Sequence, residues 1–159
     1  MKQRVTNVMR VLSAAKIPFE SYQIPEKEAE GLSGLGIALK NGQDPERTFK
    51  TLVACAKSGA YHVFMIPVRE ELDLKKAAKA AGEKAMEMIP QKQLLPLTGY
   101  VHGGCSPIGM KKPFPTYIDE SAELFDTIFF SAGHVGCQIE TSLSGLQQII
   151  PVKTADLVV

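Results

Sequence analysis

Glycines and lysines concentrate in one stretch of the chain. The segment Gly99–Gly109 contains Gly103 and Gly104, and Met110, Lys111 and Lys112 follow it. Glycines allow a backbone to approach a ligand closely and leave N–H donors uncovered, and lysines suit phosphate or carboxylate groups. The pattern therefore indicates a loop that faces an anion. A tight structural turn has the same composition and is the more common outcome for such residues alone.

A second loop of small residues, Ser131–Gly136, follows an apolar segment. It begins with Ser131, Ala132 and Gly133. If the strands that carry the two loops are neighbours, both loops frame one pocket. Taken alone, this segment too is more typical of a turn than of a site.

Two H-x-x-C units, His102/Cys105 and His134/Cys137, combine the residue types that ligate zinc. A chain of this size builds enough core without a metal, and neither unit resembles a C-x-x-C knuckle, so no metal site is expected. Cysteine near histidine also suits nucleophilic catalysis, provided that the imidazole reaches the thiol. The remaining interpretation is that both cysteines are small, buried, apolar residues.

Two charged clusters have the composition of a Mg²⁺ site and of a weak RNA-backbone patch, although a solvated surface is the more common role of each. They consist of Asp119, Glu120, Glu123 and Asp126, and of Lys75, Lys76, Lys79 and Lys84. The whole chain has a formal net charge of +1. This balance excludes a chain-wide electrostatic grip on nucleic acid and leaves only local contact with RNA.

The elements that position these loops are predicted from hydrophobic periodicity and capping residues. Helices are expected at residues 3–15, 33–40, 73–82, 91–97 and 143–150, with one helical turn at 44–46. Strands are expected at residues 51–56, 61–68, 84–89, 116–119, 127–131 and 138–141. Lys50 then stands at the start of a strand, and residues 20–31 are predicted to form a loop.

Length and composition bound the class of protein. The chain has 159 residues, of which 45% are hydrophobic and 22% charged, values that fit one globular domain and exclude disordered or collagen-like chains. No apolar run reaches the roughly 18 residues of a membrane span, and the N-terminal segment lacks the continuous apolar stretch of an export signal. Three cysteines are too few for a disulfide framework. A cytoplasmic protein without membrane association is therefore expected.

Several motifs stand in a recognisable order and spacing, namely Phe49–Leu52, Leu72–Lys75, Ala78–Gly82, Thr98–Gly109 and Pro115–Asp119. Together they closely resemble the YbaK/EbsC family of prolyl-tRNA editing-domain-like proteins, over about residues 17–150. The resemblance implies an α/β (α+β) fold in which helices flank a curved, mixed, barrel-like β-sheet. A single editing domain is then expected at residues 1–151, with a dispensable C-terminal tail at residues 152–159.

The resemblance also implies an activity: hydrolysis of the ester of a mischarged aminoacyl-tRNA in trans, with Cys-tRNA(Pro) as the expected substrate. The family's functional lysine corresponds to Lys50, and its substrate-binding loops correspond to Gly103, Gly104, Cys105, Ser106 and Pro107 and to Ser131, Ala132 and Gly133. It further implies that the thiol of the substrate attacks the ester, so no protein nucleophile, cofactor or metal is expected. The expected partners are the 3′ end of the charged tRNA and prolyl-tRNA synthetase, and not DNA.

The sequence departs from the family's pattern near the predicted site. Ala132 and Gly133 replace a pair of glycines, and Gln138 stands where an aspartate is expected. The family's tyrosine aligns with Ile24, with Tyr22 as a substitute nearby. A neutral amide cannot pair with a substrate amine as a carboxylate can. Two alternatives therefore stay open: a deacylase for a different amino acid, and a non-catalytic module that binds an aminoacyl-adenosine or a synthetase.

Overall fold

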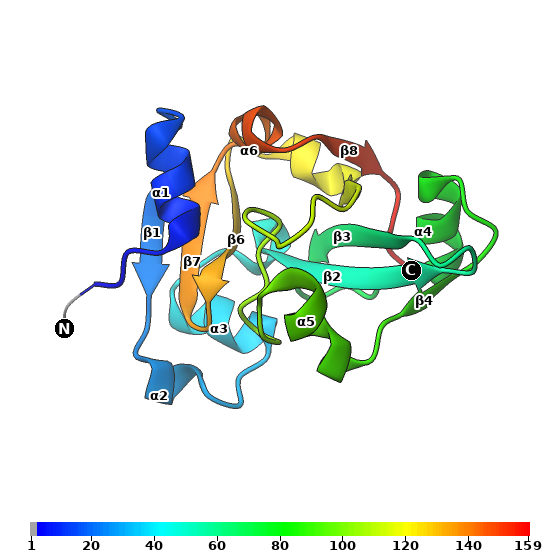
Figure 1. Cartoon of the computed structure of the whole chain (residues 1–159). Coiled ribbons are helices and arrows are strands. Elements are labelled where there is room, and N and C mark those ends of the chain that lie inside the picture. Colours follow the sequence, from blue (N-terminus) through cyan, green and yellow to red (C-terminus); the bar gives the residue numbers. More distant parts are fainter. Residues whose placement is uncertain (1–2) are drawn as a thin grey trace.

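In the computed structural model, which describes residues 3–159, the strands form two sheets (Figure 1). The smaller sheet is antiparallel, has the order β1-β7-β6, and consists of Glu20–Gln23, Cys137–Thr141 and Ile128–His134. The larger sheet is mixed, has the order β4-β2-β3-β5-β8, and consists of Met86–Met88, Phe49–Ala56, Tyr61–Pro67, Thr116–Asp119 and Val152–Ala155. A parallel bridge between Thr48 and Phe129 joins the two sheets. The predicted α/β fold with a mixed sheet is confirmed, and the sheets do not close into a barrel.

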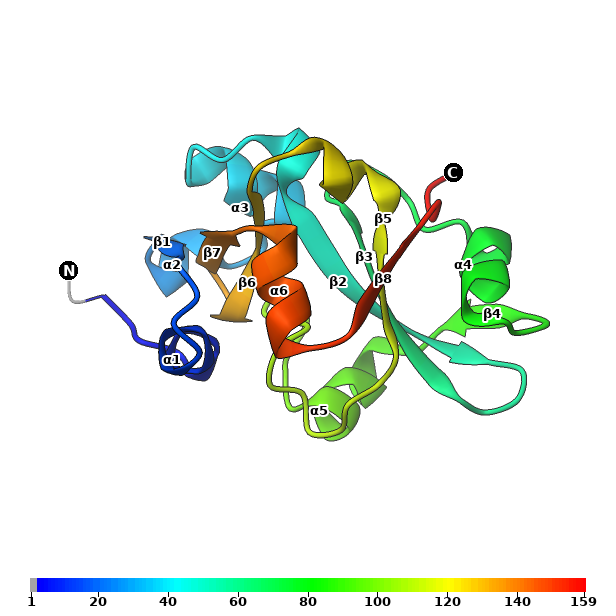
Figure 2. The same cartoon turned by 90° about the horizontal axis from the view of Figure 1, so that it is seen from above.

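Helices flank both sheets, as Figures 1 and 2 show. The α-helices are α1 (Asn7–Ala14), α2 (Glu26–Ala29), α3 (Gly34–Lys40), α4 (Leu74–Ala81), α5 (Leu94–Thr98) and α6 (Leu143–Ile149). Short 3₁₀ turns are η1 (Pro45–Arg47), η2 (Gln91–Gln93) and η3 (Glu120–Leu124). Within residues 3–159, none of these helices has the length and apolar character needed to cross a bilayer.

Local capping explains why α4 forms where the sequence predicts it. Asp73 accepts hydrogen bonds from the N–H groups of Lys75 and Lys76 at 3.0 and 3.1 Å, which satisfies two donors that the first helical turn leaves free. At the other end, Gly82 adopts φ +69°, the left-handed conformation that terminates a helix and that glycine adopts without strain.

Three apolar clusters hold the elements together. The first packs α1 against the smaller sheet and contains Leu12, Phe130 and Ile139, and the second packs α4 against the larger sheet. The third places Leu94 of α5 and Cys105 of the glycine-rich loop on Val53 and Val63 of β2 and β3. Full burial of a large apolar side chain stabilises a fold by about 1.5–3 kcal/mol. The third cluster therefore fixes the glycine-rich loop on the sheet that carries Lys50.

Residues 152–159, which are expected from the sequence to form a dispensable tail, are packed into the fold; their dispensability stays a prediction. Val152–Ala155 pairs in parallel with β5, and the side chain of Leu157 is fully buried beside Phe64 in the second cluster. Lys76 also donates to the carbonyl of Val158 at 2.7 Å, so this lysine of the predicted basic patch anchors the C-terminal segment. A four-residue strand on a sheet edge has too short a pattern to be recognised without its partner.

Residues 20–31 also differ from the predicted loop. They contain β1, which pairs with β7, and the single-turn helix α2. Both elements are only four residues long and gain their stability from contacts that are distant in sequence. The other predicted helices and strands are confirmed, with boundary shifts of a few residues.

Candidate functional site

A cavity of about 130 Å³ opens where β2, the start of α3 and the two glycine loops meet. Four residues predicted from the sequence line it, namely Lys50, Gly103, Cys105 and Ser131. Cavities of about 150 Å³ accept a ligand the size of benzene. This cavity therefore has room for an acyl group of a few non-hydrogen atoms, while a larger attached group would lie outside it.

The two glycine loops meet because Gly104 has no side chain. A Cβ atom at this position would lie 3.1 Å from the backbone nitrogen of Val135, closer than nearly all such contacts in proteins. The predicted second loop is mostly strand, since β6 continues to His134 and only residues 135–136 form the turn. Gly133 has φ +95° and donates its N–H to Ser131 Oγ at 3.1 Å, which shapes the irregular end of this strand. Gly103 and Ser131 line one cavity, although the strands beside the two segments, β5 and β6, belong to different sheets and are not the neighbours that the prediction from sequence assumes.

The other predicted binding residues have their side chains elsewhere. Ser106 is fully buried and its Oγ accepts from the N–H of Ile108 at 3.3 Å, and Pro107 lines a separate cavity. Ala132 packs in the first apolar cluster, on the α1 side of the smaller sheet. None of these three residues lines the candidate cavity, nor do Gly104 and Gly133, and the part of all five in substrate binding stays a prediction.

Lys50 lies near the start of β2, as the sequence predicts, and is half-buried. Burial lowers the pKa of its ammonium below the ordinary value, although the nearby carboxylates of Glu71 and Glu70 oppose this shift. Lys50 makes no ion pair within residues 3–159. The cation is thus partly desolvated and available to an incoming anion.

The glycine-rich loop offers unpaired donors beside this lysine. Gly104 N–H is used within the loop, since it donates to the carbonyl of Val101 at 3.0 Å. The N–H groups of Gly103 and Cys105 make no hydrogen bond to another described residue, and both residues line the cavity. Such free backbone N–H groups suit a developing negative charge on an ester oxygen.

The two H-x-x-C units do not meet. His102 and Cys105 line the candidate cavity, whereas His134 and Cys137 line a different one. Residues 3–159 contain no group of three or more His, Cys, Asp or Glu side chains arranged to hold a metal. Burial raises the pKa of the Cys105 thiol to about 12, against a smaller opposing hydrogen bond with Thr98. Cys105 is therefore a neutral thiol near pH 7.

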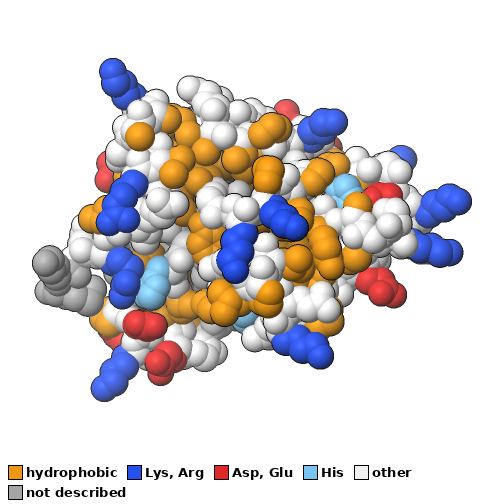
Figure 3. Space-filling model, viewed as in Figure 1, with side chains coloured by type: hydrophobic (Ala, Val, Ile, Leu, Met, Phe, Trp, Pro, Cys, Tyr) orange, Lys and Arg blue, Asp and Glu red, His pale blue; other side chains and the backbone are white. Residues whose placement is uncertain are grey.

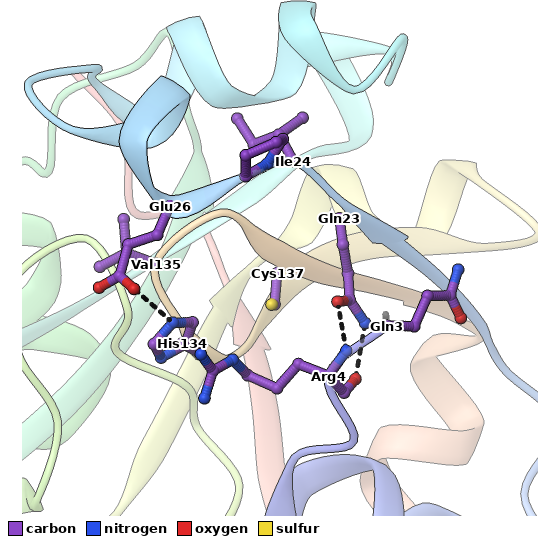
Figure 4. A pocket seen from close by; sticks show the side chains of 9 residues that line it. Gln3, Arg4, Gln23, Ile24, Glu26, His134, Val135 and Cys137 are labelled. Atoms are coloured by element: carbon purple, nitrogen blue, oxygen red, sulfur yellow. Dashed lines mark hydrogen bonds and ion pairs between the residues drawn. The ribbon is translucent and has the colours of Figure 1, made fainter. Parts of the chain in front are cut away.

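The second cavity, of about 300 Å³, is shown in Figure 4. In that view the guanidinium of Arg4 extends toward His134, whose Nε2 lies 3.7 Å from a carboxylate oxygen of Glu26. Gln23 holds the backbone of Arg4 through hydrogen bonds of 2.7 and 2.9 Å. None of the residues predicted to bind substrate lines this cavity, so the smaller one is the better candidate site.

Sequence reasoning singled out Gln138 only as a departure from the family's pattern, and it missed Gln43. Gln138 lines the cavity and lies directly opposite Ser131 in the β6–β7 ladder. Gln43, in the segment after α3, contacts Gln138. Side chains alternate between the two faces of a strand, so Gln138 shares a face of β7 with Glu140, and this pairing of polar residues is visible in the sequence. Gln43 has no comparable signal, because it reaches Gln138 across 95 positions of sequence.

The two residues considered for the position of the family's tyrosine, Tyr22 in β1 and Ile24 just after it, lie in different surroundings. Ile24 lines the second cavity. Tyr22 is paired with Gln138 across the β1–β7 ladder, but its hydroxyl donates to Glu140 at 2.8 Å and it does not line the candidate site. Tyr22 therefore supports the sheet beside the site.

Comparison with known proteins gives the family. A sequence model of the aminoacyl-tRNA editing domain matches residues 37–149. A protein of Enterococcus faecalis, named provisionally as the Cys-tRNA(Pro)/Cys-tRNA(Cys) deacylase EbsC, is 46% identical over 155 residues, which span 98% of this chain and 94% of that protein.

Two crystal structures share the fold at lower sequence identity. One, described provisionally as a trans-editing enzyme for prolyl-tRNA synthetase, is 20% identical with a TM-score of 0.79 and coverage of 98% of this chain and 99% of that one. The other, hypothetical protein APE2540, is 18% identical with a TM-score of 0.83 and coverage of 96% and 99%. The domain match and the sequence relative together show that this chain belongs to the aminoacyl-tRNA editing domain family, of the YbaK/EbsC type.

Proposed function

We propose that this protein is a trans-acting aminoacyl-tRNA deacylase whose substrate is Cys-tRNA(Pro). The observation that carries the proposal is a small cavity that combines the half-buried Lys50 with the free N–H groups of Gly103 and Cys105. The name of the 46% identical relative, a deacylase of cysteinyl-tRNA, supports the same reaction and substrate. The acyl group enters the cavity, and the 3′-terminal nucleotide stays at its mouth.

The cleavage needs no nucleophile from the protein. The thiol of the bound cysteine attacks its own carbonyl carbon, an S–C bond forms, and the ester C–O bond breaks. The 3′ oxygen leaves as a hydroxyl after it gains the proton that the thiol lost, and water then opens the cyclic thiolactone to free cysteine. Holding reactive groups together is worth effective concentrations of about 10⁵–10⁸ M in the best cases. The Cys105 thiol, with its pKa raised to about 12, is a poor competitor for this role.

Charge stabilisation is the protein's main contribution. The N–H groups of Gly103 and Cys105 stabilise the oxyanion that develops on the carbonyl oxygen. Lys50 supplies positive charge, either to this oxyanion or to the terminal phosphate of the tRNA. Both roles follow from a partly desolvated ammonium without an ion pair among the described residues.

A synthetase partner is part of the proposal. Lys and Arg side chains are spread over the face in Figure 3, with hydrophobic side chains between them. With a net charge of only +1, the protein's own attraction to the tRNA backbone is weak. We therefore place the reaction in a ternary complex with prolyl-tRNA synthetase.

Gln138 favours a second candidate, a non-catalytic module for an aminoacyl-adenosine-like ligand, because a neutral amide lines the cavity where a carboxylate would pair with an amine. Deacylation of Cys-, Ala-, Ser- and Pro-tRNA(Pro) by the purified protein, alone and together with prolyl-tRNA synthetase, separates the possibilities. Rapid cleavage of Cys-tRNA(Pro) alone supports the proposal. Cleavage of another ester instead would reassign the substrate, and binding without cleavage of any ester would favour the non-catalytic module.

A further inference from the structure

A chain of hydrogen bonds fixes the orientation of an amide at the edge of the candidate site. Thr48 Oγ1 donates its only proton to the backbone carbonyl of Asp44 at 2.7 Å. Toward Gln43 this oxygen can therefore only accept a hydrogen bond. The atom of Gln43 that lies 3.3 Å from Thr48 Oγ1 must then be the amide nitrogen, Nε2.

The orientation of the Gln43 amide also fixes that of the Gln138 amide. Gln43 Nε2 also lies 3.5 Å from Gln138 Oε1, a long hydrogen bond that directs the Gln138 oxygen toward Gln43. Both side chains are buried, with 4% and 8% exposure, so solvent competes little for the contact between them. The one side-chain hydrogen bond that Gln138 makes to another described residue uses Oε1 and leaves Nε2 without a partner among these residues. Because Gln138 lines the cavity, its two N–H donors are left for a bound acyl group.

The cavity contains no counterion for a positive charge. Among its described lining residues there is a lysine, Lys50, but no Asp or Glu. Glu70 and Glu71 act on Lys50 from exposed positions outside the lining. Glu140, two residues from Gln138 along β7, is already bonded to Arg47 at 2.9 Å and to other partners. An ammonium group placed in this cavity would lose water and gain no partner of opposite charge.

We infer, on the basis of the proposed deacylase function, that the cavity selects aminoacyl esters whose α-substituent carries no charge. Gln138 is the specificity-determining residue, because its Nε2 donates a hydrogen bond to the neutral amine or to an equivalent acceptor. Gln43 is a positioning residue that keeps the Gln138 oxygen away from the ligand. A free aminoacyl ester then binds through the fraction of molecules whose amine is unprotonated.

The test compares two stable analogues in which a 3′-amide replaces the ester of the terminal adenosine. The amine probe carries cysteine, and the hydroxyl probe carries 2-hydroxy-3-mercaptopropionate, which differs only by a neutral hydroxyl at the α-carbon. At pH 6.5 the α-amine is mostly protonated, because such amines have pKa values of about 7.7–8.0. Since fewer than roughly one amine in ten is then neutral and able to bind, calorimetry should give the hydroxyl probe an affinity at least about tenfold higher.

The Gln138→Glu variant should reverse this preference, since a carboxylate of the same shape pairs with the ammonium. Gln148→Glu adds the same charge at an exposed position of α6 and should leave the preference unchanged. Gln43→Leu frees the Gln138 amide to rotate. In a folded protein this variant should reduce the difference in affinity between the two probes. Tighter binding of the amine probe by the wild type, or no reversal in Gln138→Glu, overturns the inference alone. Failure of both probes to bind the wild type overturns the proposed function with it.

Discussion

Arg47 Nη1 lies 2.9 Å from Glu140 Oε2, and this ion pair ties the turn before β2 to the smaller sheet. The guanidinium also lies 4.7 Å from the ring centre of Phe129, which adds a cation–π contact. Arg47 stands three residues before Lys50, so the contact sets where β2 begins relative to the part of β6 that contains Ser131. The distance between the proposed catalytic lysine and the second glycine loop thus depends on a pair outside the cavity.

The ion pair predicts an acid-sensitive component of stability. Burial opposes ionisation of Glu140, but hydrogen bonds from Thr127, Tyr22 and Arg47 outweigh it and lower the pKa of the carboxyl. A lowered pKa in the folded state contributes stability above the unfolded value of about 4.3, and this contribution is lost as the pH falls through the folded pKa.

Chemical denaturation of wild type and Glu140→Gln between pH 7 and pH 3 measures this component. The variant should be less stable at pH 7, and the difference should shrink as the pH falls below about 4.3. Glu87→Gln removes an exposed carboxylate without an ion pair among the described residues and serves as the control. A difference for Glu140→Gln that stays constant over the whole range would contradict the assignment.

The C-terminal segment is predicted to be part of the stable fold. Leu157 is fully buried, and its N–H donates to Asp119 Oδ1 at 3.0 Å. Leu157→Ala should lower the free energy of unfolding by about 2–5 kcal/mol, because the truncation leaves a cavity in the second apolar cluster. Leu124→Ala, at a position that is 80% exposed, should change it by less than about 0.5 kcal/mol. Equal changes in the free energy of unfolding for the two substitutions, measured by urea denaturation, would support the expectation that the C-terminal segment is dispensable.

The elements that the sequence predicts well are those whose signals are local. The cap at Asp73, the stop at Gly82 and the Asp44-Pro45 turn act within a few residues, and the last of these correctly places Lys50 at the start of β2. By contrast, β1 and β8 depend on pairing with β7 and β5, which lie far away in the sequence. Their own four-residue patterns are too short to identify them.

The contrast between local signals and contacts that are distant in sequence also separates the predicted from the unpredicted residues of the candidate site. Glycine loops and a lysine at a strand start are local features, and the cavity brings Lys50, Gly103 and Ser131 together. The contact between Gln43 and Gln138 exists only after the chain has folded, so residue types alone do not reveal it. A resemblance between motifs does not show which side chains line a cavity, because a residue of a matched motif can instead be packed in the core, as Ala132 is.

Zinc is expected to be absent from the purified protein. The four His and Cys residues of the H-x-x-C units line two separate cavities, so they do not form a tetrahedral site. Elemental analysis of protein purified without chelators should find well below one equivalent of zinc, and treatment with EDTA should leave the thermal unfolding midpoint unchanged. Stoichiometric zinc whose removal unfolds the protein would refute this expectation.

Lys50 is predicted to be the most function-sensitive side chain. Lys50→Ala should lower the rate of Cys-tRNA(Pro) deacylation at least about tenfold, which corresponds to about 1.4 kcal/mol of transition-state stabilisation. The matched control is Lys57→Ala, an exposed lysine in the turn after β2, and it should retain wild-type activity. Single-turnover rates with circular dichroism as a folding check make the comparison. An active, folded Lys50→Ala variant would remove Lys50 from the catalytic site.

The source of the nucleophile is the last prediction. Burial raises the pKa of both Cys105 and Cys137, to about 12 for Cys105, so near pH 7 both side chains are neutral thiols. Cys105→Ser and Cys137→Ser should therefore keep most of the activity on Cys-tRNA(Pro). Replacing the cysteine of the substrate with serine should suppress cleavage far more, because a hydroxyl without an activating base is a much weaker nucleophile than a thiol.

Initial rates for wild type and both variants, each with Cys-tRNA(Pro) and Ser-tRNA(Pro), decide between a substrate thiol and a protein thiol. Thermal unfolding of each variant controls for the loss of a buried sulfur, since Cys105 packs against Val53 and Val63 in the third cluster. Loss of activity in a folded Cys105→Ser variant would make that residue the nucleophile. Equal cleavage of the two esters would show that the substrate thiol takes no part, because only one of them supplies it.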